Sequence, residues 1–332
     1  MGSAAARALA RGGREVVVLE RFRLGHRRGS SHGRSRIFRF SYRDRRYVRM
    51  AMEALPLWRE LEEDAERELI LTTGGLDLGS AALDHAAALD AEGAGFEVLD
   101  HAQAARRFPA IVFPPGRALF QPDAGIALAD RAVEAFARTA RAAGAEILED
   151  RPATGIRPDG DHAVVETAGE TFRARVAVVT AGGWARDLLA PAGFDLPVRP
   201  TRETVAYFRL AEDLPVPAVV EWNEPAAYAL RSPGQGIKAG EHGTGPDTDP
   251  NREGAADPAA VDRVAGWIRS RFPDADPEPH LAETCIYTNT ADESFILDRR
   301  GPIVVGSACS GHGFKFAPWI GRRLAELATA SR

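Results

Sequence analysis

Lysine is almost absent from this chain of 332 residues. Only Lys238 and Lys315 are lysines, and the other 40 of its 42 basic residues are arginines. Arginine therefore serves wherever a surface cation is enough, whereas lysine offers a compact ammonium whose pKa shifts readily on burial. Both lysines lie in glycine-rich surroundings, in Gly-Ile-Lys-Ala-Gly and Gly-Phe-Lys-Phe. We expect them to belong to a reaction site.

Other scarcities exclude whole classes of protein. Two cysteines, Cys285 and Cys309, cannot form a disulfide framework. No apolar run approaches the ~20 residues that span a membrane, and the N-terminus lacks the apolar segment of a secretory signal. We therefore expect a cytoplasmic protein without a membrane partner.

Charge and motifs narrow the function further. A net charge of −5 argues against a nucleic-acid partner, although residues 21–49 are crowded with arginine. The eight histidines do not cluster with cysteines or acids, so no metal site is expected. No P-loop occurs, and the G-x-S-x-G match at residues 29–33 has no predicted strand directly before it and no predicted helix directly after it, so hydrolase and kinase activities lack support.

The N-terminal residues are typical of half a dinucleotide-binding unit. Residues 4–10 predict an alanine-rich helix, and residues 15–20 predict a buried strand closed by Glu20. Such a unit uses an acid at the end of its second strand to bind ribose hydroxyls, and Gly2 matches its third glycine. An ordinary helix–strand pair remains an alternative. The first strand and the G-x-G are missing before Gly2, so we expect the natural protein to start upstream.

Helices and strands alternate at both ends of the chain around a strand-rich middle. Helices are predicted over 47–68, 81–93, 102–107, 128–143, 258–271 and 313–331, a meander over 152–175, and strands over 69–78, 146–148, 176–180, 198–240, 280–289, 294–298 and 302–306. This pattern predicts an α/β protein: a Rossmann-like nucleotide-binding domain (first strand missing) with an inserted α+β domain on a mixed, largely antiparallel sheet. The predicted ranges are 1–70, 135–200 and 292–332 for the nucleotide-binding domain, and 71–134 and 201–291 for the inserted domain.

Four blocks of the sequence resemble the monomeric sarcosine oxidase and N-methyltryptophan oxidase family. They follow the family's order with similar spacing, and comprise residues 29–39 (GSSHGRSRIFR), 236–242 (GIKAGEH), 285–293 (CIYTNTADE) and 310–316 (SGHGFKF). The resemblance covers the chain from Gly2 onward. Ala291 and Ser294 depart from the family's pattern, and Cys309 stands where relatives carry an aromatic residue, so it receives no role.

The resemblance implies FAD as cofactor, attached covalently through the sulfur of Cys285. A thiolate is the soft nucleophile that such an attachment needs, although from the residues alone Cys285 reads as a buried small hydrophobe. The cofactor-binding residues implied are Gly2, Glu20, Ser30, Ser31, Cys285, Gly311, Gly313, Phe314 and Lys315.

The same resemblance implies roles around the flavin. Lys238 would speed the reaction of the reduced cofactor with oxygen, since a fixed ammonium stabilises developing negative charge. Arg39 and Lys315 would bind the substrate carboxylate. The remaining catalytic residues implied are His32 and Arg36, against the flavin ring, and His242 and Tyr287, near the substrate.

The implied activity is oxidation of an N-methyl amino acid by oxygen, giving the demethylated amino acid, formaldehyde and hydrogen peroxide. The partners are then an amino acid and oxygen, and the protein is expected to be a monomer. Two alternatives stay open: a deaminating oxidase or dehydrogenase of a primary or cyclic amino acid, and a flavin-free, inactive remnant.

Overall fold

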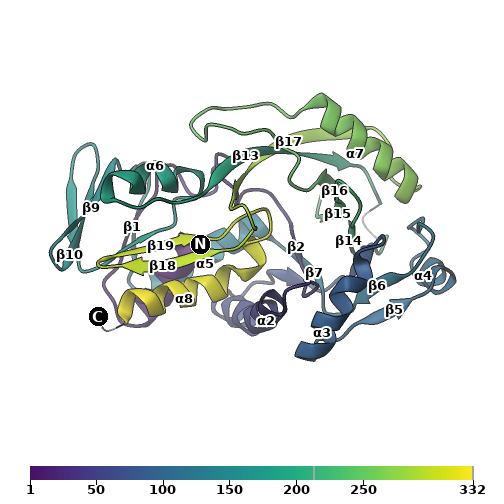
Figure 1. Cartoon of the computed structure of the whole chain (residues 1–332), viewed down its shortest axis with the longest axis horizontal. Helices are drawn as coiled ribbons and strands as arrows, with labels where there is room; N and C mark the ends of the chain where they lie inside the picture. The colour runs from purple at the N-terminus through teal and green to yellow at the C-terminus, as the bar shows by residue number, and fades with distance from the viewer. Residues whose placement is uncertain (212–213, 331–332) are drawn as a thin grey trace.

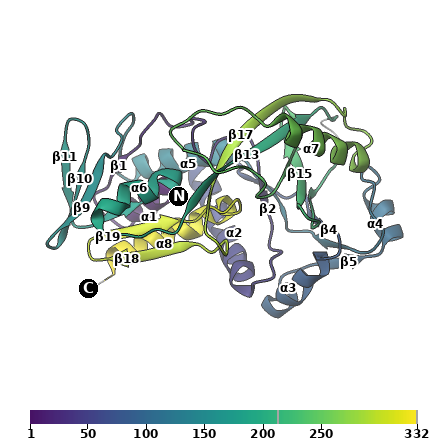
Figure 2. The same cartoon turned by 45° about the horizontal axis from the view of Figure 1, so that its top comes forward.

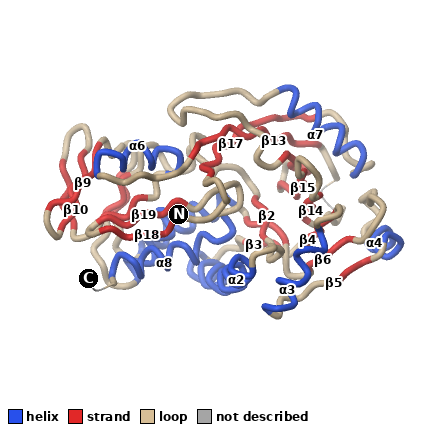
Figure 3. The backbone as a smooth tube through the Cα atoms, viewed as in Figure 1, coloured by secondary structure: helices blue, strands red, loops and turns tan. Residues whose placement is uncertain are grey.

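A computed structural model describes residues 1–211 and 214–330 (Figures 1 and 3). Its helices are α1 (Gly2–Arg11), α2 (Arg45–Ala65), α3 (Ala86–Glu92), α4 (His101–Arg107), α5 (Ala129–Ala142), α6 (Ala185–Leu189), α7 (Pro258–Arg271) and α8 (Ala317–Thr329), with 3-10 turns η1 (Ala82–His85), η2 (Gly182–Trp184), η3 (Ala190–Ala192) and η4 (Phe314–Phe316). Residues 212–213, inside the predicted strand region 198–240, and residues 331–332, at the end of the predicted last helix, lie outside the described residues.

The larger sheet has eight strands, in the order β17-β13-β16-β15-β14-β4-β6-β5. These are β17 (Pro279–Asn289), β13 (Arg199–Phe208), β16 (Gly236–Glu241), β15 (Ala227–Ser232), β14 (Ala218–Glu221), β4 (Gly75–Leu78), β6 (Ala118–Gln121) and β5 (Glu97–Leu99). Only the β14–β4 pair is parallel. The prediction of a mixed, largely antiparallel sheet is confirmed.

Alternation along β16 gives this sheet two different faces. Ile237 and Ala239 pack against Val264 and Ile268 of α7, which covers the outer face (Figure 2). Lys238, between them in sequence, points to the opposite face. Lys238 therefore lies on the face of the sheet that is directed away from α7.

The other half of the molecule contains four small sheets. The first pairs β1 (Val17–Leu19) with β8 (Glu146–Leu148), and the second contains β12 (Ala177–Val179), β19 (Ile303–Ser307) and β18 (Ile296–Arg300). The third is the meander of β9 (Gly155–Asp159), β10 (His162–Glu166) and β11 (Thr171–Ala174). The fourth contains β2 (Arg36–Phe38), β7 (Gly125–Ala127) and β3 (Ile70–Leu71). Within the described ranges, β1 pairs only with β8 and β12 pairs only with β19, both in parallel. Their free edges line a common cavity.

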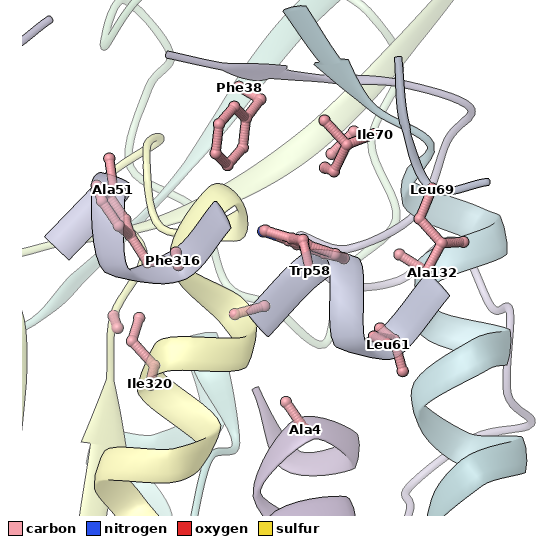
Figure 4. Packing of buried hydrophobic residues seen from close by; sticks show 14 of the residues in the cluster. Ala4, Phe38, Ala51, Trp58, Leu61, Leu69, Ile70, Ala132, Phe316 and Ile320 are labelled. Carbon is pink, nitrogen blue, oxygen red and sulfur yellow. The ribbon is translucent and has the colours of Figure 1, made fainter. Parts of the chain in front are cut away.

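Helix α2 forms the centre of the hydrophobic core of this half. Trp58 is fully buried and packs in one cluster with Phe316, Ile320 and Ala132, which bring α8 and α5 against α2 (Figure 4). Burying a side chain of this size contributes roughly 2–3 kcal/mol. The Trp58 indole also donates a hydrogen bond to the carbonyl oxygen of Lys315, at 2.7 Å. The core thus fixes the backbone of η4, which carries Lys315.

Close backbone approach explains the small residues of α1. A Cβ on Gly321 of α8 would lie 2.6 Å from the carbonyl carbon of Ala4. A Cβ on Gly2 would lie 2.8 Å from Oγ1 of Thr180, just beyond β12. Contacts under 3.0 Å are not tolerated by real Cβ atoms, so α1 packs this closely only because glycine occupies both positions.

The predicted domain ranges cut three of these elements, and the boundary at 70/71 divides β3. The boundary at 134/135 falls inside α5, and that at 200/201 falls inside β13. The division into domains stays a prediction. In the described part of the chain, no helix is long and apolar enough to cross a membrane.

Candidate active site

A cavity of about 2990 Å³ extends from the free edges of β1 and β12 to the inner face of the large sheet. Pockets for a single small ligand typically measure ~300–1,000 Å³, so this one has room for a large cofactor together with a substrate. Every residue that the sequence predicted for the site lines it: Gly2, Glu20, Ser30, Ser31, His32, Arg36, Arg39, Lys238, His242, Cys285, Tyr287, Gly311, Gly313, Phe314 and Lys315. The fold thus brings together side chains from both ends of the chain.

One end of the cavity contains the N-terminus of α1 and the end of β1. Gly2 begins the helix, whose first N–H groups favour negative charge. Glu20 directly follows β1, and its Oε1 accepts a hydrogen bond from the backbone of Phe22 at 3.0 Å. His26 lies 3.6 Å from the same oxygen. A carboxylate and a helix N-terminus are therefore available for the nucleotide portion of a cofactor.

Arg36 holds the loop before β2 in a folded conformation. Its guanidinium donates to the carbonyl oxygens of Ser30 at 2.8 Å, His32 at 2.6 Å and Ser35 at 2.9 Å. Its Nη2 also lies 4.0 Å from the sulfur of Cys285. The loop and β17, some 250 residues apart in sequence, are joined by this side chain and by the Ser30 hydroxyl, which donates to the carbonyl oxygen of Ile286.

His32 presents an unsatisfied nitrogen in this loop. The residue is buried, and its Nε2 has no hydrogen-bond partner among the described residues. Burial, followed by the charges of Arg36 and Lys238, lowers the pKa of His32 to about 4. The imidazole is therefore neutral at physiological pH and can bond to a ligand in the cavity.

Lys238 lies on the cavity face of β16. It pairs across the sheet with Tyr207, and its ammonium is 5.9 Å from the centre of that ring. The hydroxyl of Tyr207 donates to Glu283 at 2.9 Å. Burial, then the nearby charge of Arg36, lowers the pKa of Lys238 to about 7. Near neutral pH this amine is close to its titration point, as expected of a reactive group.

Glycines shape the loop that packs against Tyr287 of β17 in the cavity wall. A Cβ on Gly311, where φ is +73°, would lie 2.2 Å from the ring of Tyr287. A Cβ on Gly313 would lie 1.9 Å from the carbonyl oxygen of Ala308. This loop therefore requires glycine to pass so close to its neighbours. The rings of Tyr287 and His242 are 5.7 Å apart on the same wall.

Arg39 and Lys315 meet at Tyr42. The Arg39 guanidinium lies 4.9 Å from the centre of the Tyr42 ring, and the Lys315 ammonium lies 5.4 Å from it. Lys315 donates to the Tyr42 hydroxyl at 2.8 Å and to the His312 carbonyl at 2.9 Å. Burial, then Arg39, holds the pKa of Lys315 well below its usual value. Two cations converging in a low-dielectric wall form a site for one anionic group.

The sequence did not single out several residues of this wall. Tyr42 follows Arg39 by three residues, and Glu293 and His312 lie inside blocks that were recognised. Glu293 lies 3.3 Å from His242 Nε2, and its carbonyl lies 3.0 Å from His312 Nε2. Burial raises the pKa of Tyr228, which also lines the cavity. Proximity to the matched blocks was the only signal that could have indicated the first three.

These observations fit a flavin nucleotide. The cavity has a sufficient volume, glycines that admit close approach, and an unsatisfied buried nitrogen at His32. Within residues 1–211 and 214–330, no group of three or more His, Cys, Asp or Glu side chains could hold a metal ion.

Comparison with known proteins agrees with this geometry. The family model "FAD dependent oxidoreductase" matches residues 1–327. The chain is 34% identical to peroxisomal sarcosine oxidase of Homo sapiens, over 96% of this chain and 87% of that protein. It is 30% identical to monomeric sarcosine oxidase of Bacillus sp. (strain B-0618), over 100% of this chain and 90% of that protein.

A solved structure shares the whole architecture. NikD, described as an unusual amino acid oxidase essential for nikkomycin biosynthesis, superposes in its open form with a TM-score of 0.88 at 30% identity. The match covers 98% of this chain and 91% of that one. The predicted fold class is confirmed. The chain belongs to the family of FAD-dependent oxidoreductases.

Proposed function

We propose that this oxidoreductase oxidises an N-methyl (secondary) amino acid such as sarcosine or N-methyltryptophan. The products are the demethylated amino acid, formaldehyde and hydrogen peroxide. One observation carries the proposal: Arg39 and Lys315 converge on Tyr42 in the wall of a cavity that also contains Arg36, Lys238 and Cys285. The sarcosine oxidases among its relatives support this substrate class.

The cationic pair would bind the substrate carboxylate. Two of the N–H bonds of Lys315 are directed at Tyr42 and His312, which leaves one of the three donors of an ammonium for a ligand. Arg39 uses Nη1 for Asp77 and Ser41, so its remaining N–H groups can donate to the same carboxylate. This fixes one end of the amino acid and determines where its nitrogen lies.

When bound, FAD supplies the oxidation of the amine and passes the electrons to oxygen. Cys285 would hold it covalently, since its sulfur lines the cavity beside Arg36. His32, neutral and unsatisfied, would accept or donate one hydrogen bond to it. Arg36 would place positive charge where negative charge develops when the cofactor is reduced, and Lys238 where negative charge develops when oxygen is reduced; such fixed charges are a major electrostatic contribution to catalysis.

A second function rests on the similarity to NikD, an amino acid oxidase. In it the same carboxylate site holds a primary or cyclic amino acid, and a primary amine releases ammonia instead of formaldehyde. We further propose a cytoplasmic monomer that needs no partner chain.

The test is product analysis after oxygen consumption. Purified protein is supplied with sarcosine, N-methyltryptophan, glycine and proline, and peroxide, formaldehyde and ammonia are measured. Equal amounts of peroxide and formaldehyde from an N-methyl substrate support the first function. Ammonia with peroxide from glycine, or peroxide with neither ammonia nor formaldehyde from proline, supports the second function. A colourless protein that is inert toward all four substrates supports the flavin-free alternative.

A further inference from the structure

A buried carboxylate stands behind the cationic pair. Asp77 interrupts the otherwise apolar strand β4 and is only 2% exposed. Its Oδ1 accepts hydrogen bonds from the Trp222 indole at 2.7 Å and from Arg39 Nη1 at 3.1 Å. Burying a charge costs several kcal/mol per ion unless it is paired and hydrogen-bonded, and here both partners are present.

The partners of Asp77 face the cavity, whereas Asp77 is not part of its lining. The Arg39 guanidinium lies between two aromatic rings, 4.7 Å from the centre of Trp222 and 4.9 Å from that of Tyr42. Asp77 thus holds both the arginine and one of the rings that enclose it.

The third neighbour of Asp77 is His85. Its ring stands edge-on to Trp222, with centres 5.0 Å apart, and its Nδ1 lies 3.8 Å from Asp77. Burial lowers the pKa of His85 to about 4. The imidazole is therefore neutral at physiological pH, and the positive charge of Arg39 compensates the negative charge of Asp77.

We propose that Asp77 is a positioning residue for carboxylate binding: it fixes Arg39 through Nη1 between Trp222 and Tyr42, so that the rest of the guanidinium faces the cavity beside Lys315. The inference rests on the proposed function, because it assumes that the ligand at Arg39 is a carboxylate. It assigns Asp77 no contact with that ligand.

The same sheet offers a matched control on its other face. Glu221 of β14 is also 2% exposed and accepts hydrogen bonds from an indole, Trp267, at 2.6 Å and from Arg271 at 2.7 and 2.8 Å. Asp77 pairs with Val220 across the sheet, so Glu221, one residue further, points away from Asp77. Glu221, Trp267 and Arg271 do not line the cavity; Glu221 also accepts a hydrogen bond from Asn223, a cavity residue that forms no hydrogen bond with Asp77 or Arg39.

The experiment measures binding of benzoate, a carboxylate that cannot be oxidised at an amine, by titration calorimetry of the purified full chain. Asp77→Asn is expected to weaken benzoate about tenfold, since a charge-assisted bond loses its fixed geometry. Glu221→Gln is expected to leave benzoate affinity unchanged. Unchanged or tighter binding in Asp77→Asn overturns the proposal.

A double-mutant cycle separates positioning from a general structural role. In an Arg39→Met background, Asp77→Asn should have no further effect on benzoate, because the group through which it acts is gone. The same loss in both backgrounds would mean that Asp77 only supports the fold. If Asp77→Asn does not fold, Trp222→Phe keeps the ring but removes the bond to Asp77. A loss of about threefold is then expected, and unchanged affinity overturns the inference.

Benzoate binding also separates this inference from the proposed function. If the enzyme acts on another class of amino acid, no formaldehyde is formed from N-methyl substrates, but Asp77 and Arg39 remain coupled in the binding of benzoate. If wild-type protein does not bind benzoate at all while it oxidises a neutral amine, the carboxylate assignment and this inference fall together.

Discussion

Lys315 donates a hydrogen bond to the hydroxyl of Tyr42 at 2.8 Å, and Arg39 lies over the ring of the same tyrosine. One aromatic side chain therefore sets the distance between two cations that belong to segments about 275 residues apart. This contact gives the clearest test of the substrate site.

Replacing Lys315 by Met should raise KM for the amino-acid substrate by about 10- to 100-fold, because one charge-assisted hydrogen bond of roughly 1.5–3 kcal/mol is lost. This KM is measured from steady-state oxygen consumption. Arg106→Ala, an exposed arginine on α4 outside the cavity, is the control and should leave KM unchanged. An unaltered KM in Lys315→Met would remove this lysine from the binding site.

Lys238→Met should slow the reaction of the reduced enzyme with oxygen by about 100- to 1,000-fold, the range found when one electrostatic stabiliser is removed. Anaerobic bleaching by substrate should change little. Stopped-flow spectroscopy separates the two half-reactions. Equal losses in both would show that Lys238 acts on the fold or on the substrate instead.

The same residue predicts a pH dependence of stability. Burial lowers the pKa of Lys238 to about 7 in the folded protein, from 10.5 for a solvated lysine. Between these values the unfolded chain binds the extra proton, so stability rises with pH, and burial of the charge costs most below pH 7. Lys238→Met should therefore increase the free energy of unfolding at pH 6 by up to ~5 kcal/mol, and by much less at pH 10. Urea titrations at both pH values test this, and an equal gain at both contradicts it.

Cys285→Ser should abolish covalent attachment of the flavin. Acid precipitation of wild-type protein should leave a yellow pellet, whereas that of the variant should release the colour into solution. Cys309→Ser is the control, because the sulfur of Cys309 also lines the cavity. A yellow pellet from Cys285→Ser would show that the flavin is not attached to Cys285. A colourless pellet from Cys309→Ser alone would place the covalent bond at Cys309.

Gly313→Ala should destabilise the protein severely, since its Cβ would lie 1.9 Å from the Ala308 carbonyl oxygen. We expect a loss above about 3 kcal/mol, beyond the usual effect of a single substitution. Gly169→Ala, where nothing lies within 4 Å of the added carbon, should change stability by less than about 0.5 kcal/mol. Thermal melting of both variants compares them directly.

Much of the architecture follows from local patterns in the sequence. The predicted helices over 128–143 and 258–271 lie within one residue of α5 and α7, because each has an apolar stripe and clear ends. The predicted helix over 81–93 is instead a 3-10 turn, η1, followed by the short helix α3. Its alanines favour either form, and contacts distant in sequence decide between them.

Site residues were predictable where glycine-rich blocks surround them, as for Lys238 and Lys315. Tyr228 lies outside the four matched blocks, and its spacing to Lys238 does not indicate a shared site. The β15–β16 pairing places it opposite Gly240, and a hairpin register of this kind is not visible in residue spacing. Asp77 could be suspected as a lone acid in an apolar strand, but its bond to Trp222, 145 residues away, exists only in the folded chain.

The indole of Trp58 ties the innermost packing of α2 to the main chain of Lys315. Heating that loosens this packing should release the ammonium before the sheets come apart. The enzyme would then lose affinity for anionic substrates some degrees below the midpoint of its melting curve. Its activity would fall at a lower temperature than the circular dichroism signal of its secondary structure.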